Sequence, residues 1–202
     1  MADGCTDATA SLARAAGADV LESPSRQGKA TALLMGWRHL LRERSVSAIL
    51  MLDGDGQHAP EEIPAFLKVW STAGCDLLVG QRDLSAPAMP CLRQLTNRLM
   101  SGAIQRLSGI RCPDTQCGFR LASRAFLSSR AWRSTHFELE SEMILHAGAD
   151  RWTVQNLPVK TIYHGKRSYI RVWPDLKRWL HLLKALPKNG RHAADLIANP
   201  TL

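Results

Sequence analysis

The feature that most constrains this chain is a short apolar run, residues 48–52, that leads directly into the turn DGDGQ beginning at Asp53. An apolar run of this length is typical of a buried strand. In open α/β sheets, ligands bind just beyond the carboxyl ends of such strands. The segment therefore predicts a buried central strand that delivers two carboxylates, Asp53 and Asp55, to a site.

The rest of the chain alternates between β-rich and helical patterns. We expect strands at residues 19–22, 47–52, 76–80, 119–122, 152–157 and 159–163. We expect helices at residues 9–16, 28–44, 60–72, 92–107, 138–147 and 174–186. This alternation predicts an α/β fold with a largely parallel sheet.

Composition narrows the class of protein. A length of 202 residues and a hydrophobic fraction of 45% suit one folded domain with a sizeable core. The apolar runs are too short to span a bilayer, and no signal peptide is recognised, so the expected location is cytoplasmic. The five cysteines are odd in number and include no CxxC pair, so we expect reduced thiols, mostly in or near the core.

Positive charge is concentrated near the end of the chain. Residues 151–202 hold ten Lys/Arg and two Asp/Glu, which equals the net charge of +8 of the whole chain. Such a segment suits phosphate groups of lipids, lipid-linked substrates or nucleic acid. The alternative is a solvated segment that only aids solubility.

The acidic turn has the chemistry of a metal site. The carboxylates of Asp53 and Asp55 and the carbonyl of Gln57 are hard oxygen ligands that suit Mg²⁺ or Mn²⁺. Diphosphate oxygens and water would complete the shell, and the metal would neutralise a leaving nucleoside diphosphate. The alternative is a polar loop without a ligand. His58 follows directly and either assists the site or has a structural role.

Five segments in the right order resemble motifs of one family. They are DGCTDAT from Asp3, QGK at residues 27–29, the acidic turn from Asp53, DTQCGFR at residues 114–120 and FELE at residues 137–140. The chain resembles family 2 glycosyltransferases of the GT-A fold, in the branch of dolichol-phosphate mannose synthase and polyprenyl-phosphate sugar transferases. The resemblance covers about residues 3–183 and implies a Rossmann-like nucleotide-diphospho-sugar transferase fold.

The resemblance implies residues that bind the nucleotide-sugar donor: Asp3, Gly28, Lys29, Asp53 and Gly54. Ala2 stands where the family usually has an acid, and Cys5 where it has a serine. Asp3 also suits a cap for the helix that follows, and Lys29 suits an ordinary surface position.

The resemblance further implies a catalytic set: Asp55, Asp114, Arg120, Glu138 and Glu140. Arg120 is expected to bind phosphate in a bidentate manner, or else to form a structural pair with Asp114. A hydroxyl acceptor needs a carboxylate base, whereas a phosphate acceptor needs none. Glu138 and Glu140 therefore act either as a base or in orienting the substrates.

The expected residues for acceptor or phosphate binding are Arg82, Arg93, Lys166 and Arg167. The last two lie in a Gly/Lys/Arg/Ser loop that resembles the family's closing loop. The helix expected at residues 174–186 has an apolar face that suits either peripheral membrane contact or packing onto the domain.

Relatives of this type begin with one more strand, so the fold is expected to lack its first β-strand. We expect a truncated GT-A catalytic domain at residues 1–165 and a basic C-terminal segment with an amphipathic helix at residues 166–202. We also expect this truncated form to be weakly active, inactive or poorly folded.

The expected function is inverting, metal-dependent transfer of a sugar from a nucleoside-diphosphate sugar to a polyprenyl-phosphate or related lipid-linked acceptor. A family 2 glycosyltransferase with a hydroxyl acceptor and an inactive truncated homologue remain as alternatives. Nucleic-acid binding would rest on the basic segment alone, and we do not expect it.

Overall fold

The computed structural model describes residues 1–84, 91–160, 162 and 178–183, with no side chains for residues 91–93. The described residues fall into two compact units. The first holds residues 1–46 and 132–139 with the helical turn 178–183, and the second holds residues 47–84, 91–131, 140–160 and 162.

The first unit contains a small βαβ arrangement. Strand β1 (Ala2–Asp3) pairs in parallel with β2 (Glu22–Ser23), and α1 (Thr9–Ala15) connects them. Helix α2 (Lys29–Leu40) follows. Its buried Trp37 packs edge to face against Trp132, with ring centroids 5.8 Å apart. This aromatic pair ties α2 to a segment almost a hundred residues further along the chain.

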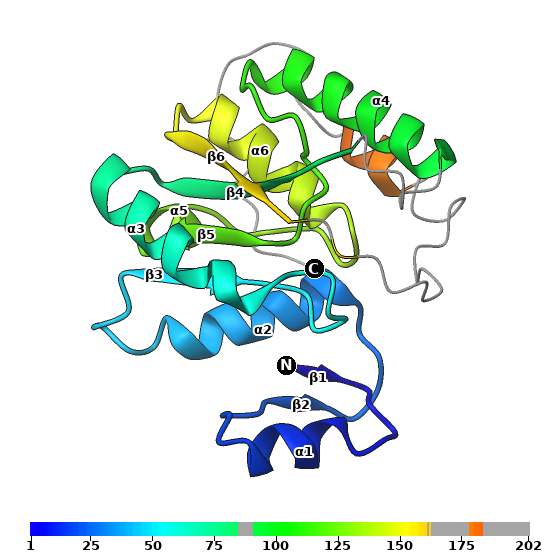
Figure 1. Cartoon of the computed structure of the whole chain (residues 1–202), viewed down its shortest axis with the longest axis vertical. Coiled ribbons are helices and arrows are strands. Elements are labelled where there is room, and N and C mark those ends of the chain that lie inside the picture. The colour runs from blue at the N-terminus through cyan, green and yellow to red at the C-terminus, as the bar shows by residue number, and fades with distance from the viewer. Residues whose placement is uncertain (85–90, 161, 163–177, 184–202) are drawn as a thin grey trace. The chain divides into compact units, whose positions relative to one another are not determined.

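The second unit is built on a four-stranded sheet with the order β3-β5-β4-β6. The strands are β3 (Ala48–Met51), β4 (Leu77–Arg82), β5 (Arg120–Ser123) and β6 (Val154–Val159). Strand β5 runs antiparallel to both β3 and β4, whereas β4 and β6 are parallel. Strands β3, β4 and β6 therefore all end at one edge of the sheet, which we call the carboxyl edge (Figure 1).

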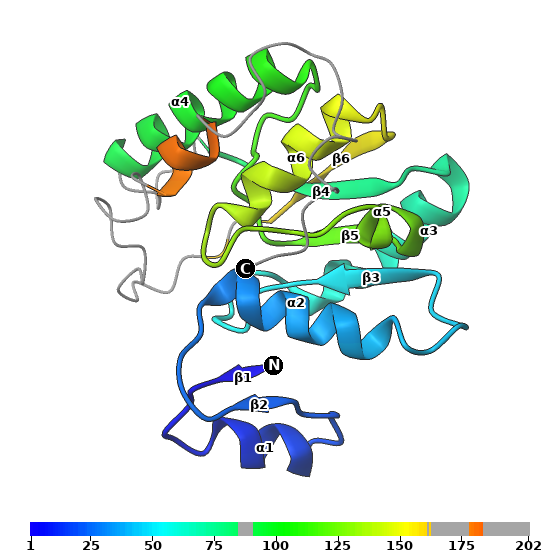
Figure 2. The same cartoon turned by 180° about the vertical axis from the view of Figure 1, so that it is seen from behind.

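Helices lie on both faces of this sheet. The 3-10 turn η1 (Pro60–Glu62) leads into α3 (Ile63–Ala73), followed in the chain by α4 (Cys91–Ser108), α5 (Arg124–Ser128) and α6 (Leu139–Ala149). Figures 1 and 2 show α3 on one face and α5 with α6 on the other. Phe66 of α3 is fully buried and stacks on Phe119, with centroids 4.1 Å apart. Among the described residues, no helix is long and apolar enough to cross a membrane.

Most elements expected from the sequence are confirmed within a few residues. The expected strand at residues 19–22 is displaced, because the observed strand is Glu22–Ser23. A second strand starting at residue 159 is not formed. Strand β6 ends at Val159, and the next amide, that of Lys160, donates to Glu62 Oε1 at 3.0 Å. The short helix α5 was not expected; its N-cap is Ser123, whose hydroxyl accepts the Phe126 N–H.

The expectation of a largely parallel sheet is wrong for the second unit. The segment between α4 and β5 returns to the carboxyl edge before β5 begins, so β5 must run opposite to its neighbours. Strand β3 is also an edge strand of this four-stranded sheet rather than a central one. Its residues alternate between half-buried and buried, as a strand covered mainly on one face does.

The expectation about the cysteines is confirmed for the thiols that the structure describes. Cys75, Cys112 and Cys117 are buried and free, and Cys5 is exposed and free. The helix expected at residues 174–186 is helical at residues 178–183, and the remainder lies outside the described residues.

Candidate functional site

The acidic turn after β3 is held by its own neighbours. The Asp53 backbone N–H donates to His58 Nδ1 at 3.1 Å. Asp55 accepts from Gln57 twice, from the backbone N–H at 3.0 Å and from the side-chain amide at 2.7 Å. Gly56 has a φ of 81°, which a residue with a side chain rarely adopts. The loop thus presents both carboxylates on a tight, internally bonded turn.

His58 anchors this turn to the core. It is only 4% exposed, and its ring stacks on Phe119 with centroids 5.3 Å apart. Because Nδ1 accepts the Asp53 N–H, the neutral ring carries its proton on Nε2, which lies 4.0 Å from Cys117 Sγ. Burial raises the pKa of the Cys117 thiol to about 11, so the thiol stays protonated. Of the two roles left open for His58, this geometry supports the structural one.

The oxygen atoms of the turn are of the kind that bind a hard divalent cation. Among the described residues, no group of three or more His, Cys, Asp or Glu side chains is arranged to hold a metal ion. The roles of Asp53, Asp55 and Gln57 as metal ligands stay predictions, and their oxygen atoms are of the kind that Mg²⁺ and Mn²⁺ prefer.

A buried ion pair lies at the end of β4, which is separated from β3 by β5. Arg82, the last residue of β4, places Nε 2.6 Å from Asp114 Oδ2 and Nη2 2.9 Å from Asp114 Oδ1. Both side chains are almost completely buried. The expected structural pair between Asp114 and Arg120 is therefore not formed, because Arg82 occupies both carboxylate oxygens.

Arg120 instead organises the loop before β5. It is 1% exposed, and it donates to the backbone carbonyls of Cys117 at 2.8 Å, Thr115 at 2.7 Å and Glu140 at 2.9 Å. The guanidinium thus joins the turn of residues 115–117 to the start of α6. Its role as a phosphate ligand stays a prediction, and in this arrangement its donors are directed to carbonyls.

The two candidate glutamates belong to different units. Glu138, in the first unit, accepts the backbone N–H of Thr135 at 3.0 Å and that of His136 at 3.3 Å through Oε1. Glu140, in the second unit, is 4% exposed on α6, and its backbone carbonyl is the one bound by Arg120. Their catalytic roles stay predictions.

The first unit carries the expected nucleotide-binding segment. The Asp3 carboxylate accepts the backbone N–H groups of Gln27 at 2.8 Å and Gly28 at 2.9 Å, which fixes the start of α2. Gly28 has a φ of 103°, and a Cβ there would lie 2.7 Å from the Thr135 carbonyl oxygen. Lys29 begins α2 with Nζ 5.7 Å from the centre of the Phe137 ring. The expected cap by Asp3 of the helix that follows it, α1, is not formed, because the Asp3 carboxylate binds the backbone before α2 instead. The role of Asp3 in nucleotide binding stays a prediction.

Several predicted residues are brought to one place in the second unit. The strand directions put the acidic turn, Arg82 and the segment before Arg120 at the same carboxyl edge. This edge was predictable for the acidic turn, but the contact between Arg82 and Asp114 was missed, since 32 residues separate them. The side chain of Arg93 and all of Lys166 and Arg167 lie outside the described residues.

Comparison with known proteins identifies the family to which these features correspond. A family model described as "Glycosyl transferase family 2" matches residues 1–130. The low-salt glycan biosynthesis hexosyltransferase Agl6 of Haloferax volcanii is 27% identical over 98% of this chain and 45% of its own length. The polyprenol monophosphomannose synthase of Mycolicibacterium smegmatis is 32% identical over 62% of this chain and 50% of its own length.

A third relative is a UDP-N-acetylglucosamine–dolichyl-phosphate N-acetylglucosaminyltransferase of Methanococcus voltae, 28% identical over 60% of this chain and 50% of its own length. The chain thus spans about half the length of these three curated relatives.

Solved structures show the same fold. Glucosyl-3-phosphoglycerate synthase of Mycobacterium tuberculosis, in complex with Mn²⁺, UDP-glucose and glycerol 3-phosphate, superposes with a TM-score of 0.69 at 22% identity. That match covers 90% of this chain and 65% of the other chain. The same enzyme with Mn²⁺, UDP and glucosyl-3-phosphoglycerate gives a TM-score of 0.65 at 21% identity. The expected GT-A fold is confirmed.

Proposed function

Because the chain belongs to glycosyl transferase family 2, we propose that it transfers a sugar from a nucleoside-diphosphate sugar to a polyprenyl phosphate or related lipid-linked acceptor. The observation that carries the proposal is the acidic turn at the carboxyl edge. The turn is fixed by a hydrogen bond from the Asp53 backbone N–H to His58, and the Asp55 carboxylate accepts from the Gln57 backbone N–H.

The donor is proposed to bind with Mg²⁺ or Mn²⁺ held by Asp53, Asp55 and Gln57. The metal supplies charge neutralisation for the leaving nucleoside diphosphate. His58 holds the Asp53 backbone, while Gln57 orients the Asp55 carboxylate through its amide. Asp3 fixes the start of α2, where Lys29 is proposed to contact a phosphate group of the donor.

The proposed chemistry is a single in-line displacement with inversion. An acceptor oxygen forms a bond to the anomeric carbon as the bond from that carbon to the diphosphate oxygen breaks. The diphosphate leaves with the electron pair. A phosphate acceptor is already ionised at neutral pH, so no side chain needs to remove a proton.

The choice of acceptor is supported by the names of two relatives. One is named for transfer to dolichyl phosphate and another as a polyprenol monophosphomannose synthase. A hydroxyl acceptor is the second candidate, and the buried Glu140 carboxylate of the second unit favours it as a base. The two candidates differ in whether a glutamate is needed for turnover.

We further propose that the protein works at the cytoplasmic face of a membrane. The support is the concentration of positive charge in residues 151–202, which suits anionic headgroups. The proposal includes peripheral contact through the C-terminal segment and no nucleic-acid partner.

Transfer from radiolabelled UDP- and GDP-sugars to undecaprenyl or dolichyl phosphate in detergent tests the proposal. Label is expected in the organic phase only with Mn²⁺ or Mg²⁺, and Asp55→Asn is expected to abolish the transfer. The product's anomeric configuration reports inversion. Transfer to a hydroxyl acceptor alone, lost in Glu140→Gln, would replace the first candidate with the second.

A further inference from the structure

Glu138 holds the loop that precedes α6 in the first unit. Its side chain is buried, and Oε1 accepts the backbone N–H groups of Thr135 at 3.0 Å and His136 at 3.3 Å. The second carboxylate oxygen, Oε2, lies 4.0 Å from Arg178 Nε. Both oxygens of Glu138 therefore face groups of the protein itself, and Oε1 fixes the shape of the loop.

This loop, residues 135–137, packs against the start of α2, more than a hundred residues earlier in the chain. The Thr135 carbonyl oxygen accepts the Thr31 backbone N–H at 3.4 Å and lies 3.5 Å from Thr31 Oγ1. A Cβ at Gly28 would lie 2.7 Å from the same carbonyl oxygen and 3.2 Å from the His136 ring. The loop and the start of the helix are therefore in direct contact, at a distance that leaves no room for a side chain at residue 28.

The same loop carries the aromatic ring that lies beside Lys29. Lys29 is the first residue of α2, and its Nζ lies 5.7 Å from the centre of the Phe137 ring, within the range of a cation–π contact. The Asp3 carboxylate accepts the two backbone N–H groups that precede Lys29. Two carboxylates therefore position Lys29, that of Asp3 through the preceding backbone and that of Glu138 through the loop.

We infer that Glu138 is a positioning residue for the donor, because it holds residues 135–137 against the start of α2 and so fixes Lys29 for the diphosphate of the nucleotide sugar. The inference rests on the proposed function, in which Lys29 contacts a phosphate group of the donor. A lysine binds phosphate as a point charge on a flexible stem, so its contribution depends on how firmly the stem is held. Glu138 acts through other residues and does not itself contact the donor or the acceptor.

A role for Glu138 as the base of a hydroxyl acceptor makes different demands. A base must reach the acceptor hydroxyl and take up its proton, whereas Glu138 Oε1 is bound by two backbone N–H groups of the loop. Two substitutions separate these roles. Glu138→Gln keeps an oxygen atom that accepts both N–H groups but cannot act as a base, and Glu138→Ala removes the oxygen altogether.

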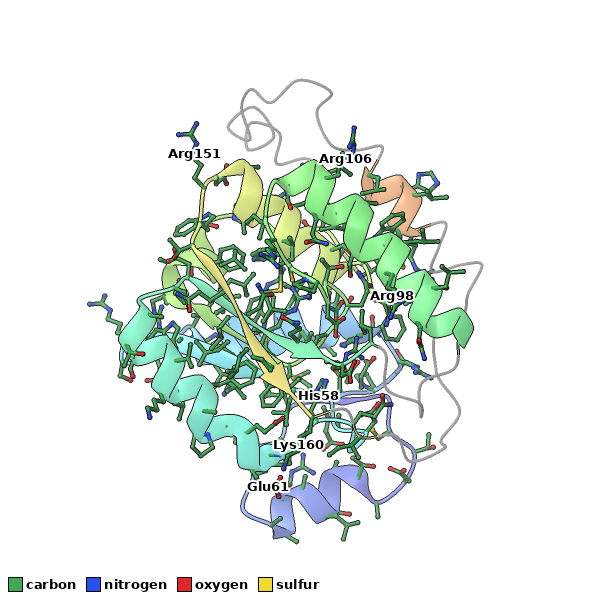
Figure 3. All side chains as sticks on the ribbon, turned by 45° about the horizontal axis from the view of Figure 1, so that its top comes forward. His58, Glu61, Arg98, Arg106, Arg151 and Lys160 are labelled. Carbon is green, nitrogen blue, oxygen red and sulfur yellow. The ribbon has the colours of Figure 1, made fainter. Side chains whose placement is uncertain are left out.

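Hydrogen–deuterium exchange of the whole chain without ligand tests the contact itself. Glu138→Ala is expected to raise amide exchange about tenfold in residues 135–137 and at Thr31, because the loop loses the acceptor that holds it against α2. Glu138→Gln should change the exchange less than about twofold. The control is Glu61→Ala, which removes an exposed glutamate from η1 of the second unit, just before α3 (Figure 3).

Calorimetric titration with UDP-glucose and GDP-mannose in the presence of Mn²⁺ tests the effect on the donor. Glu138→Ala is expected to weaken donor binding about tenfold, and Glu138→Gln less than about twofold. In a Lys29→Met background, Glu138→Ala should weaken binding no further, because the lysine through which Glu138 acts is absent. Phe137→Leu is a second variant that keeps the carboxylate, and it is expected to weaken donor binding about threefold by removing the ring beside Lys29.

The inference is overturned if Glu138→Ala leaves the exchange at Thr31 unchanged, or if its effect on donor binding is the same with and without Lys29. It is also overturned if both Glu138 variants bind the donor as the unmodified chain does while Glu138→Gln abolishes transfer, since that result would assign Glu138 as a base. An unmodified chain that shows the expected exchange but binds neither donor refutes the proposed function and leaves the coupling of Glu138 to α2.

Discussion

Arg82 and Asp114 face each other across the carboxyl edge with both oxygens of the carboxylate engaged, at 2.6 and 2.9 Å. The pair joins the end of β4 to the loop before β5, and it is buried. Burying a charge whose partner has been removed is expensive. The pair therefore fixes the geometry of this edge more than it adds to stability.

This arrangement predicts that the costs of the two single substitutions are not additive in a double-mutant cycle. Asp114→Asn alone is expected to lower the free energy of unfolding by about 3 kcal/mol, because Arg82 is left buried with its charge uncompensated. Arg82→Met with Asp114→Asn should cost less than the sum of the two single changes. Urea denaturation measures the free energy of unfolding of the two single variants and the double variant. Strictly additive costs would show that the two side chains do not interact in solution.

Arg120 gives a prediction of a different kind. Its three donors reach three carbonyls at 2.7 to 2.9 Å, which the single ammonium of a lysine cannot do. Arg120→Lys is expected to lower the free energy of unfolding by about 2 kcal/mol, measured by urea denaturation. Phosphate binding by the folded variant should match that of the unmodified chain, and a selective loss of phosphate binding would assign Arg120 to the ligand instead.

Helices α4 and α6 approach each other so closely at one point that only glycine fits. A Cβ at Gly148 would lie 2.2 Å from the Ser108 carbonyl oxygen. Gly148→Ala is expected to cost about 3 kcal/mol of unfolding free energy, because backbone must move.

Gly102 of α4 serves as the matched control, since a Cβ there meets nothing within 4 Å. Gly102→Ala is expected to stabilise by about 0.5 to 1 kcal/mol through helix propensity. Thermal unfolding measures the stability of both variants. Equal effects at the two positions would contradict the close approach of α4 and α6 at Gly148.

His146 predicts how stability depends on pH. Its ring is 2% exposed, with Nε2 2.6 Å from Ser129 Oγ and Nδ1 3.0 Å from Asp150 Oδ2. Burial, with a smaller contribution from Arg130, lowers the pKa of His146 from 6.5 to about 4, although Asp150 acts in the opposite direction. The folded protein therefore keeps this ring neutral.

Between pH 6.5 and about 4, the unfolded chain binds a proton at this position that the folded protein does not. The contribution of His146 is thus fully present above pH 6.5 and is lost as the pH falls, by an amount on the order of 2 kcal/mol. His146→Gln should flatten this part of the stability profile measured by urea denaturation. An unchanged slope in the variant would show that His146 does not carry the effect.

The sequence predicts the acidic turn well because its signal is local. An apolar strand followed by DGDGQ needs no distant partner to be recognised, and the observed β3 ends two residues before Asp53. Residues whose contacts are distant in the sequence were harder to predict. The partner of Asp114 is 32 residues away, and nothing in the local pattern favours Arg82 over Arg120.

The direction of β5 was missed for a related reason. Periodicity reveals that residues 120–123 form a strand, but the path of the preceding loop sets whether that strand runs parallel or antiparallel.

The central claim is that Asp53 and Asp55 hold a metal-bound nucleotide sugar. Calorimetric titration of the whole chain with UDP- and GDP-sugars, with and without Mn²⁺, tests it most directly. Asp53→Asn and Asp55→Asn are compared with Glu61→Gln, which removes an exposed acid from η1. The account predicts binding that requires Mn²⁺, that disappears in both aspartate variants, and that persists in Glu61→Gln. Binding that ignores metal and both aspartates, or no binding by a chain shown to be folded, would contradict it.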